Sequence, residues 1–510
     1  MKGRRYPLGI QTFKNIIEGN YVYVDKTDLI YELVHEKKYC FLSRPRRFGK
    51  SLLVTTLQAY FEGKKELFKG LKLEALEKDW EKHPVIHLDL SKGKYYNMES
   101  LIETLDKILE TYEDLYQITS VSTEAFNVRL IRIINAAKQK TGRNVVVLID
   151  EYDVPLQAAY QNNYYEEMVD FLRSVFSSAL KTNDALEKGV MTGCLRISKE
   201  SIFTGLNNIS SESFGFTELE VKQLLKDYNL SEKMDEVKEW YDGYSFASVH
   251  SVYSPRSVIE AVLSGICDSY WNQTETFEAL KIYIDMNFDG LKDDVLSMMV
   301  GERVAINTGG FTNDMVTFHS KDDVLTLLIH LGYLAYDFED KCVYIPNNEV
   351  RGEYVNAVSV SEWGEVSEAL RNSAWTLRSI WERRPEQVSK GIEQAHFETS
   401  HLQYNDENAL SYTISLALYA ARNFYQIYRE LPTGKGFADL VFIPRKKFPD
   451  KPALIVELKW DKTAKGAINQ IKNKQYFESL QEYQGNLLLV GVNYDKDTRE
   501  HQCEIEEFYK

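Results

Sequence analysis

The chain has 510 residues, of which 44% are hydrophobic, 27% charged and 13% aromatic, and its formal net charge is -15. At about 100–200 residues per domain, this length predicts two to four domains with ordinary buried cores, and the negative charge argues against a protein that coats nucleic acid by bulk electrostatics. There is no run of about 18 uncharged apolar residues, no apolar signal core and no paired cysteine spacing, so we expect a cytoplasmic protein in a reducing compartment, with no membrane partner.

The first 215 residues alternate between apolar runs and stretches with helical spacing. The predicted strands are 39–43, 85–90, 145–149 and 189–194, and the predicted helices are 51–62, 99–117 and 124–140. Strands that alternate with helices in this way form a parallel sheet covered by helices. We therefore predict an α/β domain over residues 1–215.

Residues 216–385 form a predicted middle region that is mainly helical. Near its end, an amphipathic helix at 323–331 precedes two short strands, 332–336 and 342–345, and a helix resumes at 348–355. Helix, hairpin and helix in this order suggest a winged-helix-like module. Such a module either contacts DNA or packs against a neighbouring domain.

The predicted C-terminal domain covers residues 386–510. A helix beginning near Asp406 is followed by strands at 424–429, 437–443 and 453–460, a helix at 464–480 and a last strand at 487–492. Lysines and arginines outnumber acids between 435 and 474. This excess predicts either a local basic groove for nucleic acid or an ordinary solvated face.

A phosphate-binding pattern lies between the first strand and the first of these helices, in the run Arg44-Pro45-Arg46-Arg47-Phe48-Gly49-Lys50-Ser51. Phosphate binding needs backbone N–H groups, a lysine for the phosphates and a hydroxyl for Mg²⁺. Gly49, Lys50 and Ser51 supply these groups, although Arg44 stands where the usual motif has its first glycine. The strand before the loop and the helix after it favour a nucleotide site, because a helix N-terminus attracts anions.

An acidic pair ends the predicted strand 145–149, as a nucleotide site requires. Asp150 would hold the Mg²⁺ shell and Glu151 would orient the attacking water, while the intervening predicted strand 85–90 carries Asp89. Thr192 and Arg196 are candidates to sense the γ-phosphate. A buried hydroxyl and a surface ion pair are the alternatives for these two residues.

The C-terminal strand 453–460 carries a second candidate site. Glu457 and Lys459 lie two residues apart, so they share a face of the strand, and Asp439 on the preceding strand can bring a second carboxylate near them. Two carboxylates beside a lysine form a site for Mg²⁺ or Mn²⁺ at a phosphodiester. The alternative is a structural cluster in which Lys459 compensates the buried acids.

These motifs, with Leu148-Ile149-Asp150-Glu151-Tyr152-Asp153 and Ser201-Ile202-Phe203-Thr204-Gly205-Leu206-Asn207-Asn208, resemble the bacterial AAA-ATPase-like family that carries a C-terminal PD-(D/E)XK nuclease-like domain. The resemblance covers nearly the whole chain. It implies a P-loop NTPase domain whose arginine-rich loop replaces the glycine-rich one, and a restriction-endonuclease-like C-terminal domain. It also implies a further acid at Glu407, a supporting Gln470 and Glu430 as an addition.

The sequence therefore predicts a protein that binds, and by expectation hydrolyses, ATP with Mg²⁺ and uses a metal-dependent nuclease-like domain on nucleic acid, with DNA favoured over RNA. The alternative is a nucleotide-dependent switch or scaffold whose nuclease fold is catalytically silent. An oligomer is left open. The predicted nucleotide-binding residues are Arg46, Arg47, Phe48, Gly49, Lys50, Ser51, Leu52 and Asp150. The predicted catalytic residues are Glu151, Asp439, Glu457 and Lys459, and the predicted metal ligands are Ser51, Asp150, Asp439, Glu457 and Glu407.

Overall fold

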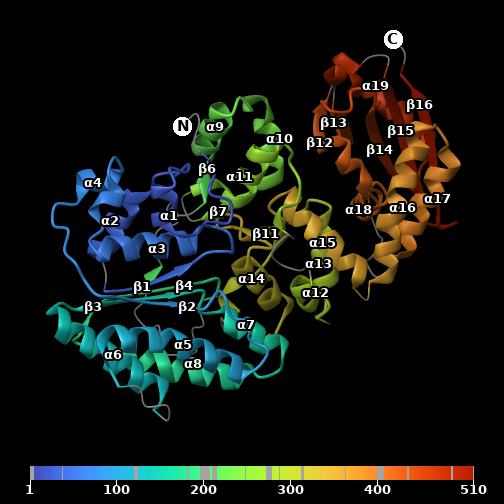
Figure 1. Cartoon of the computed structure of the whole chain (residues 1–510). Helices are drawn as coiled ribbons and strands as arrows, with labels where there is room; N and C mark the ends of the chain where they lie inside the picture. Colours follow the sequence, from blue (N-terminus) through green and yellow to red (C-terminus); the bar gives the residue numbers. More distant parts are fainter. Residues whose placement is uncertain are drawn as a thin grey trace. The chain divides into compact units, whose positions relative to one another are not determined.

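The computed structural model divides the chain into two compact units (Figure 1). Unit 1 comprises Met1–Thr276 and Arg303–Glu353, and unit 2 comprises Phe277–Glu302 and Tyr354–Lys510. The structure describes residues 5–36, 38–119, 124–180, 183–195, 207–208, 215–246, 249–271, 278–286, 288–311, 315–361, 363–398, 407–433, 436–483 and 486–508. Within these ranges, no helix has the length and apolar character needed to cross a membrane.

The helices of unit 1 are α1 (Phe13–Glu18), α2 (Thr27–Glu36), α3 (Lys50–Phe61), α4 (Lys72–Leu76), α5 (Met98–Tyr116), α6 (Phe126–Thr141), α7 (Val154–Gln161), α8 (Tyr165–Leu180), α9 (Glu218–Asp227), α10 (Met234–Tyr241), α11 (Pro255–Ser264), α14 (Lys321–Leu331) and the start of α15 (Asn348–Val360). Its strands are β1 (Tyr39–Ser43), β2 (Val85–Asp89), β3 (Val145–Asp150), β4 (Leu186–Gly193), β5 (Asn207–Asn208), β6 (Phe216–Thr217), β7 (Tyr244–Phe246), β8 (Val249–Tyr253), β9 (Val304–Ala305), β10 (Ala335–Asp337) and β11 (Cys342–Tyr344).

The predicted parallel sheet is confirmed, with the strand order β2-β3-β4-β1-β5. Helix α3 packs on one face and α5 and α6 pack against the strands as well, so the sheet lies between helical layers (Figure 1). All six residues of β3 are buried, as expected for a strand covered on both faces. Because parallel strands end at the same edge, the loop after β1 and the acids at the end of β3 come together.

The middle region contains more strand than the sequence predicted. Two small antiparallel sheets, β6-β8-β7 and β10-β11-β9, accompany its helices. The predicted helix, hairpin and helix are present as α14, β10 with β11, and α15, and β9 adds a third strand to the hairpin. The missed strands are only two to five residues long, which is too short to show an apolar alternation.

Unit 2 is built around a five-stranded mixed sheet. Its helices are α12 (Glu278–Ile284), α13 (Leu291–Met299), α16 (Gly364–Trp381), α17 (Pro385–Glu398), α18 (Glu407–Ala417) and α19 (Ala464–Lys474), and its strands are β12 (Tyr425–Thr433), β13 (Gly436–Pro444), β14 (Ala453–Trp460), β15 (Leu487–Asp495) and β16 (Glu500–Glu507). The order is β12-β13-β14-β15-β16, and only β14 and β15 are parallel. One face packs against α16, α17 and α18 and the other against α19, which gives two cores.

Short 3-10 helices complete the two units, at Lys65–Phe68, Ser231–Lys233, Thr308–Gly310, Tyr419–Asn423 and Tyr476–Tyr483. In unit 2, the segment from the middle of the chain is tied to the C-terminal part by side chains. Arg429 forms a salt bridge of 2.5 Å with Glu302, and Arg422 donates to the carbonyl of Val300. Residues 277–302 are therefore an integral part of unit 2.

A buried histidine, His501, makes the stability of unit 2 depend on pH. The ring of His501 lies 5.1 Å from that of His396 and 4.9 Å from that of Tyr494. Burial, with a smaller contribution from His396, lowers the pKa of His501 from 6.5 to about 3. The unfolded histidine binds its proton first as the pH falls, so the stability is fully present above pH 6.5 and is lost towards pH 3.

We expect the free energy of unfolding to fall by about 2 kcal/mol between pH 6.5 and pH 5 from this group. Urea unfolding at a series of pH values measures the change, and His501→Phe should flatten it. The exposed His250, replaced by Gln, is the control. An equally steep decline in His501→Phe would contradict the assignment.

Candidate functional sites

The loop between β1 and α3 has the backbone shape of an anion site. Arg47 and Gly49 both lie in the left-handed region, with φ of 71° and 85°, and α3 begins directly at Lys50. Loops that mix right-handed and left-handed residues can aim backbone N–H groups at one anion, and the helix N-terminus adds a partial positive charge. The loop can therefore bind phosphate although Arg44 replaces the usual glycine.

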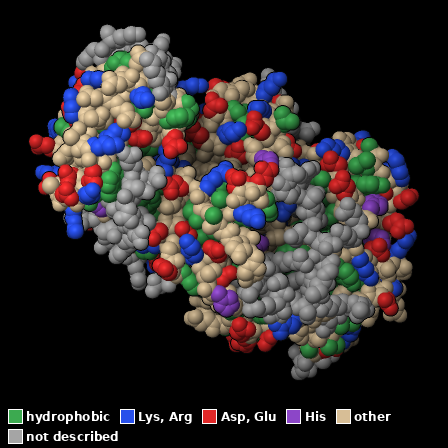
Figure 2. All heavy atoms as spheres, turned by 180° about the vertical axis from the view of Figure 1, so that it is seen from behind, with side chains coloured by type: hydrophobic (Ala, Val, Ile, Leu, Met, Phe, Trp, Pro, Cys, Tyr) green, Lys and Arg blue, Asp and Glu red, His purple; other side chains and the backbone are tan. Residues whose placement is uncertain are grey.

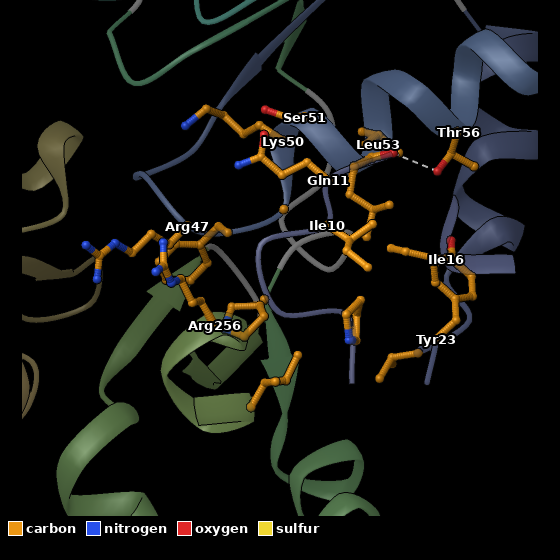
Figure 3. A pocket seen from close by; sticks show the side chains of 18 of the residues that line it. Ile10, Gln11, Ile16, Tyr23, Arg47, Lys50, Ser51, Leu53, Thr56 and Arg256 are labelled. Atoms are coloured by element: carbon orange, nitrogen blue, oxygen red, sulfur yellow. Dashed lines mark hydrogen bonds between the residues drawn. The ribbon is translucent and has the colours of Figure 1, made fainter. Parts of the chain in front are cut away.

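A cavity of about 530 Å³ opens at this loop (Figure 3). Its wall includes residues 46–53, residues 6–11 of the N-terminal segment, and Arg256 and Ile259 of α11. Ligand pockets of about 300–1,000 Å³ hold small molecules of nucleotide size. The polar end at Lys50 and Ser51 and the apolar side chains of Ile10, Leu53 and others suit a ligand that joins a charged group to an apolar ring.

Lys50 is almost fully buried and is held by the loop and by the acidic pair. Its Nζ donates to the carbonyls of Arg44 at 3.0 Å and Pro45 at 3.2 Å, and it lies 3.1 Å from Oε1 of Glu151. The predicted lysine and the predicted glutamate are thus brought together. A buried ammonium is stable only with such partners, so an anionic ligand at the loop would have to compete for it.

Thr192, near the end of β4, connects Asp150, the last residue of β3, with Glu151. Its hydroxyl donates to Asp150, and its oxygen accepts the backbone N–H of Glu151 at 3.0 Å. Burial, and then the charge of Glu151, raise the pKa of Asp150 to about 6, while hydrogen bonds from Thr192 and Ser51 lower it. Asp150 and Ser51 therefore meet as a carboxylate and a hydroxyl, a pair that suits Mg²⁺.

The side chains of the other predicted loop residues are engaged by the protein itself. Arg46 donates to the side chain of Gln157, and Phe48 is buried with its ring 5.0 Å from that of Tyr244. Arg47 bonds to backbone carbonyls far along the chain. Arg46, Arg47, Phe48 and Leu52 all line the cavity, so a ligand there would compete with these contacts for the two arginines.

Asp153 is a site residue that the sequence analysis did not single out. It is fully buried, and its Oδ2 accepts the backbone N–H groups of Cys194 at 2.8 Å and Leu195 at 3.2 Å. It thereby holds the segment after β4 against the loop. The signal was present in the motif 148–153, in which Asp153 is the third acid. Arg196, the other candidate sensor, lies outside the described residues, as do 201–206 of the third motif.

The second site lies on β14 and is centred on Glu457. Lys459 lies 3.0 Å from Oε1 of Glu457, and Gln470 of α19 donates to the same oxygen. The other oxygen, Oε2, is buried and accepts no hydrogen bond from the described residues. Asp439 accepts the backbone N–H of Leu458 at 2.7 Å. Burial, and then the charge of Asp439, raise the pKa of Glu457 to about 7.

The structure describes the other predicted residues of this site to different extents. Glu407 begins α18, but its side chain lies outside the described residues. Glu430 is exposed, with a φ of 46°, at the point in β12 that faces Asp439. Tyr476, which the sequence analysis missed, lies with its hydroxyl 3.4 Å from Nε2 of Gln470. Among the described side chains, no three of the types His, Cys, Asp and Glu form a ready metal cluster.

Part of the lysine excess near the C-terminus is paired with acids. Lys465 lies 2.9 Å from Glu504 and also pairs with Glu506, which pairs in turn with Lys472. These acids belong to β16, a strand that the sequence analysis did not predict. On the face shown in Figure 2, positive and negative side chains are likewise intermixed.

Comparison with known families assigns both ends of the chain. Residues 7–203 match a family described as predicted AAA-ATPase, and residues 407–504 match the PD-(D/E)XK nuclease superfamily. The chain joins an AAA-ATPase-like domain to a PD-(D/E)XK nuclease-like domain. The match to the ATPase-like domain includes the loop, Asp150 and Glu151, and the match to the nuclease-like domain includes Asp439 and Glu457.

Two individual proteins show further similarity to this ATPase-like and nuclease-like chain. An "Uncharacterized protein in vnfD 5'region" of Azotobacter chroococcum mcd 1 is 34% identical over 288 residues, which are 54% of this chain and 55% of that protein. The chain thus spans about half the length of this curated relative. The structure of the Aeropyrum pernix ORC2 protein covers 68% of this chain and 98% of its own, at 10% identity and a TM-score of 0.28.

Proposed function

We propose that the protein binds and hydrolyses ATP at the loop before α3 and, under the control of this nucleotide, cleaves nucleic acid at the Glu457 site. The observation that carries the nuclease part is the buried Oε2 of Glu457, which has no hydrogen-bond donor among the described residues. A buried carboxylate oxygen without a donor is costly unless a cation compensates it. The free oxygen therefore favours a metal ligand over a purely structural acid.

At the nucleotide site, the residues fit ATP with Mg²⁺. The backbone around Gly49 and the start of α3 would bind the phosphates, and Lys50 would leave Glu151 to reach them. Ser51 and Asp150, which are already hydrogen-bonded, would hold Mg²⁺. Glu151 would then be free to orient the attacking water. Its second oxygen, Oε2, is buried and accepts no hydrogen bond from the described residues, so it is available for that role.

At the second site, the oxygen donors of Glu457 and Asp439 fit a hard divalent cation, Mg²⁺ or Mn²⁺. When bound, the metal would neutralise charge on a phosphodiester and lower the pKa of water. Glu457 would bind through its free Oε2 while Lys459 and Gln470 hold Oε1. Lys459 would stabilise the developing negative charge or position the water, and Glu407 would add a further acid from α18.

The test is an incubation of the purified full chain with plasmid, linear and single-stranded DNA and with RNA, in Mg²⁺ or Mn²⁺, with and without ATP. We expect metal-dependent cleavage, of DNA before RNA, that changes when ATP is present. Asp439→Ala should abolish cleavage and leave ATP binding intact. Cleavage that persists in Asp439→Ala would refute the site assignment.

A second function, a nucleotide-dependent switch with a silent nuclease fold, is favoured by one specific observation. Lys459 and Gln470 already contact Glu457, so part of its charge is compensated by the chain itself. If the protein is such a switch, we expect no cleavage under any of the conditions above, together with intact ATP binding. Nucleic-acid binding without cleavage would then identify the domain as a binding platform.

For the ATPase reaction, we predict that Thr192→Val lowers the hydrolysis rate about 10- to 100-fold, because the hydroxyl holds both Asp150 and the backbone of Glu151. It should also lower the free energy of unfolding by about 1–3 kcal/mol, since buried groups lose their partner. Phosphate release and urea unfolding measure the two effects. Thr192→Ser keeps the hydroxyl and should behave like the wild type. A wild-type hydrolysis rate in Thr192→Val would show that the hydroxyl is not needed.

A further inference from the structure

Arg47 connects the nucleotide loop to a distant segment of unit 1. Its guanidinium donates to the carbonyl of Tyr270 at 2.8 Å and to that of Trp271, and it lies 5.0 Å from the centre of the indole ring of Trp271. Two carbonyls and an aromatic face match the planar, forked shape of an arginine side chain. Arg47 also lines the nucleotide cavity (Figure 3), so a phosphate bound there would compete for the same guanidinium.

Glu349 binds the segment that Arg47 holds. This glutamate is fully buried in the first turn of α15, and its Oε1 accepts the backbone N–H of Tyr270 at 2.9 Å. Its Oε2 accepts the hydroxyl of Ser257 at 2.8 Å. Ser257 follows Arg256, which lines the nucleotide cavity from α11. The carboxylate of Glu349 is therefore linked to both arginines of the cavity wall, to Arg47 through Tyr270 and to Arg256 through Ser257.

The charge of Glu349 also depends on Arg47. Burial raises the pKa of Glu349 to about 7, while the hydrogen bonds from Ser257 and Tyr270 and, to a smaller extent, the positive charge of Arg47 lower it. If the guanidinium turned towards a phosphate, the buried carboxylate would lose part of its electrostatic support. Movement of Arg47 would thus change both the geometry and the charge at the start of α15.

Helix α15 starts at these contacts. It runs from Asn348 to Val360, and Glu349 lies in its first turn. A change in the partners of Glu349 therefore acts on the start of this helix.

We propose that Arg47 and Glu349 form a relay through which nucleotide at the loop before α3 changes the state of α15. This inference rests on the proposed nucleotide function and specifies which element of the chain responds to the nucleotide. The relay has two states. In one, Arg47 donates to the carbonyls of Tyr270 and Trp271, and in the other it has turned towards the phosphate. A ligand shifts such an equilibrium only by its differential affinity for the two states.

The test is hydrogen–deuterium exchange of peptides covering residues 354–360 in the full chain, with and without ATP and Mg²⁺, and with ATP affinity measured on the same samples. We expect ATP to change the exchange rate there by about fivefold or more in the wild type. Glu349→Gln, which keeps the size of the side chain but not its charge, should lose most of this change while retaining ATP binding. Glu339→Gln, an exposed acid of unit 1, is the matched control.

Ser257→Ala removes a single hydroxyl from the relay and carries the test if Glu349→Gln does not fold. Arg47→Lys keeps a positive charge but cannot donate to two carbonyls in the same way, so it should also lose the exchange response. An unchanged exchange rate in wild-type protein that binds ATP would overturn the relay. A full response in all three variants would overturn it too. A wild type that binds no ATP would instead refute the proposed nucleotide function.

Discussion

Lys50→Met is expected to weaken ATP binding by about 100-fold or more. The ammonium of Lys50 is buried and has two loop carbonyls and Glu151 as partners, so it is already positioned at the phosphate end of the cavity. Truncating one partner of a buried, hydrogen-bonded charge pair at a binding interface costs about 2–5 kcal/mol, and about 1.4 kcal/mol corresponds to a tenfold change in affinity. Calorimetric titration with ATP and Mg²⁺ measures the loss.

The control for this variant is Lys72→Met, because Lys72 also forms an ion pair, with Asp28 at 2.7 Å, but is exposed on α4. Lys50→Arg separates binding from folding. It keeps a cation for Glu151, yet its larger head group does not fit the position of the ammonium, so we expect a folded protein with weak ATP binding. Wild-type affinity in Lys50→Met would show that the nucleotide binds elsewhere.

Glu457→Gln is expected to reduce nucleic-acid cleavage by about 1,000-fold or more, because the amide cannot replace a carboxylate as a metal ligand and several kcal/mol of transition-state stabilisation would be lost. Initial rates on the preferred nucleic acid measure this effect. Glu386→Gln, an exposed acid on α17 of the same unit, should cleave at the wild-type rate.

The same substitution should stabilise the metal-free protein. Burial raises the pKa of Glu457 from 4.5 to about 7, so the unfolded carboxyl loses its proton first and the stability of the wild type falls as the pH rises through this window. Glutamine does not titrate, and we expect Glu457→Gln to be more stable by about 1–3 kcal/mol above pH 7. Mg²⁺ should stabilise only the wild type. A loss of stability in the variant would indicate a structural role.

The elements that were predicted well have strong local signals. Strands β1 and β14 were expected at 39–43 and 453–460 and have these bounds, because apolar runs in them end at charged residues. Strand β16 was missed because its residues, Glu500–Glu507, are mostly polar and it pairs along only one edge, with β15. An edge strand of this kind carries little apolar alternation.

The candidate sites show the same limit on what a sequence can reveal. The spacing of Glu457 and Lys459 fixes a shared strand face, and the structure places the two side chains 3.0 Å apart. No local pattern, however, shows that Arg47 turns to Tyr270, more than 200 positions along the chain, or that Phe48 packs on Tyr244. Contacts between residues so distant depend on the packing of the whole unit.

Unit 2 is built from two separated stretches of the chain. This order limits how the protein can be divided into fragments. Residues 277–302 come before the last stretch of unit 1, and Glu302 and Val300 bind arginines of the C-terminal stretch. Joining two genes end to end would not produce this interleaved order. A fragment cut at either single junction would leave one unit incomplete. The two units are therefore expected to be expressed and to fold only as parts of one chain.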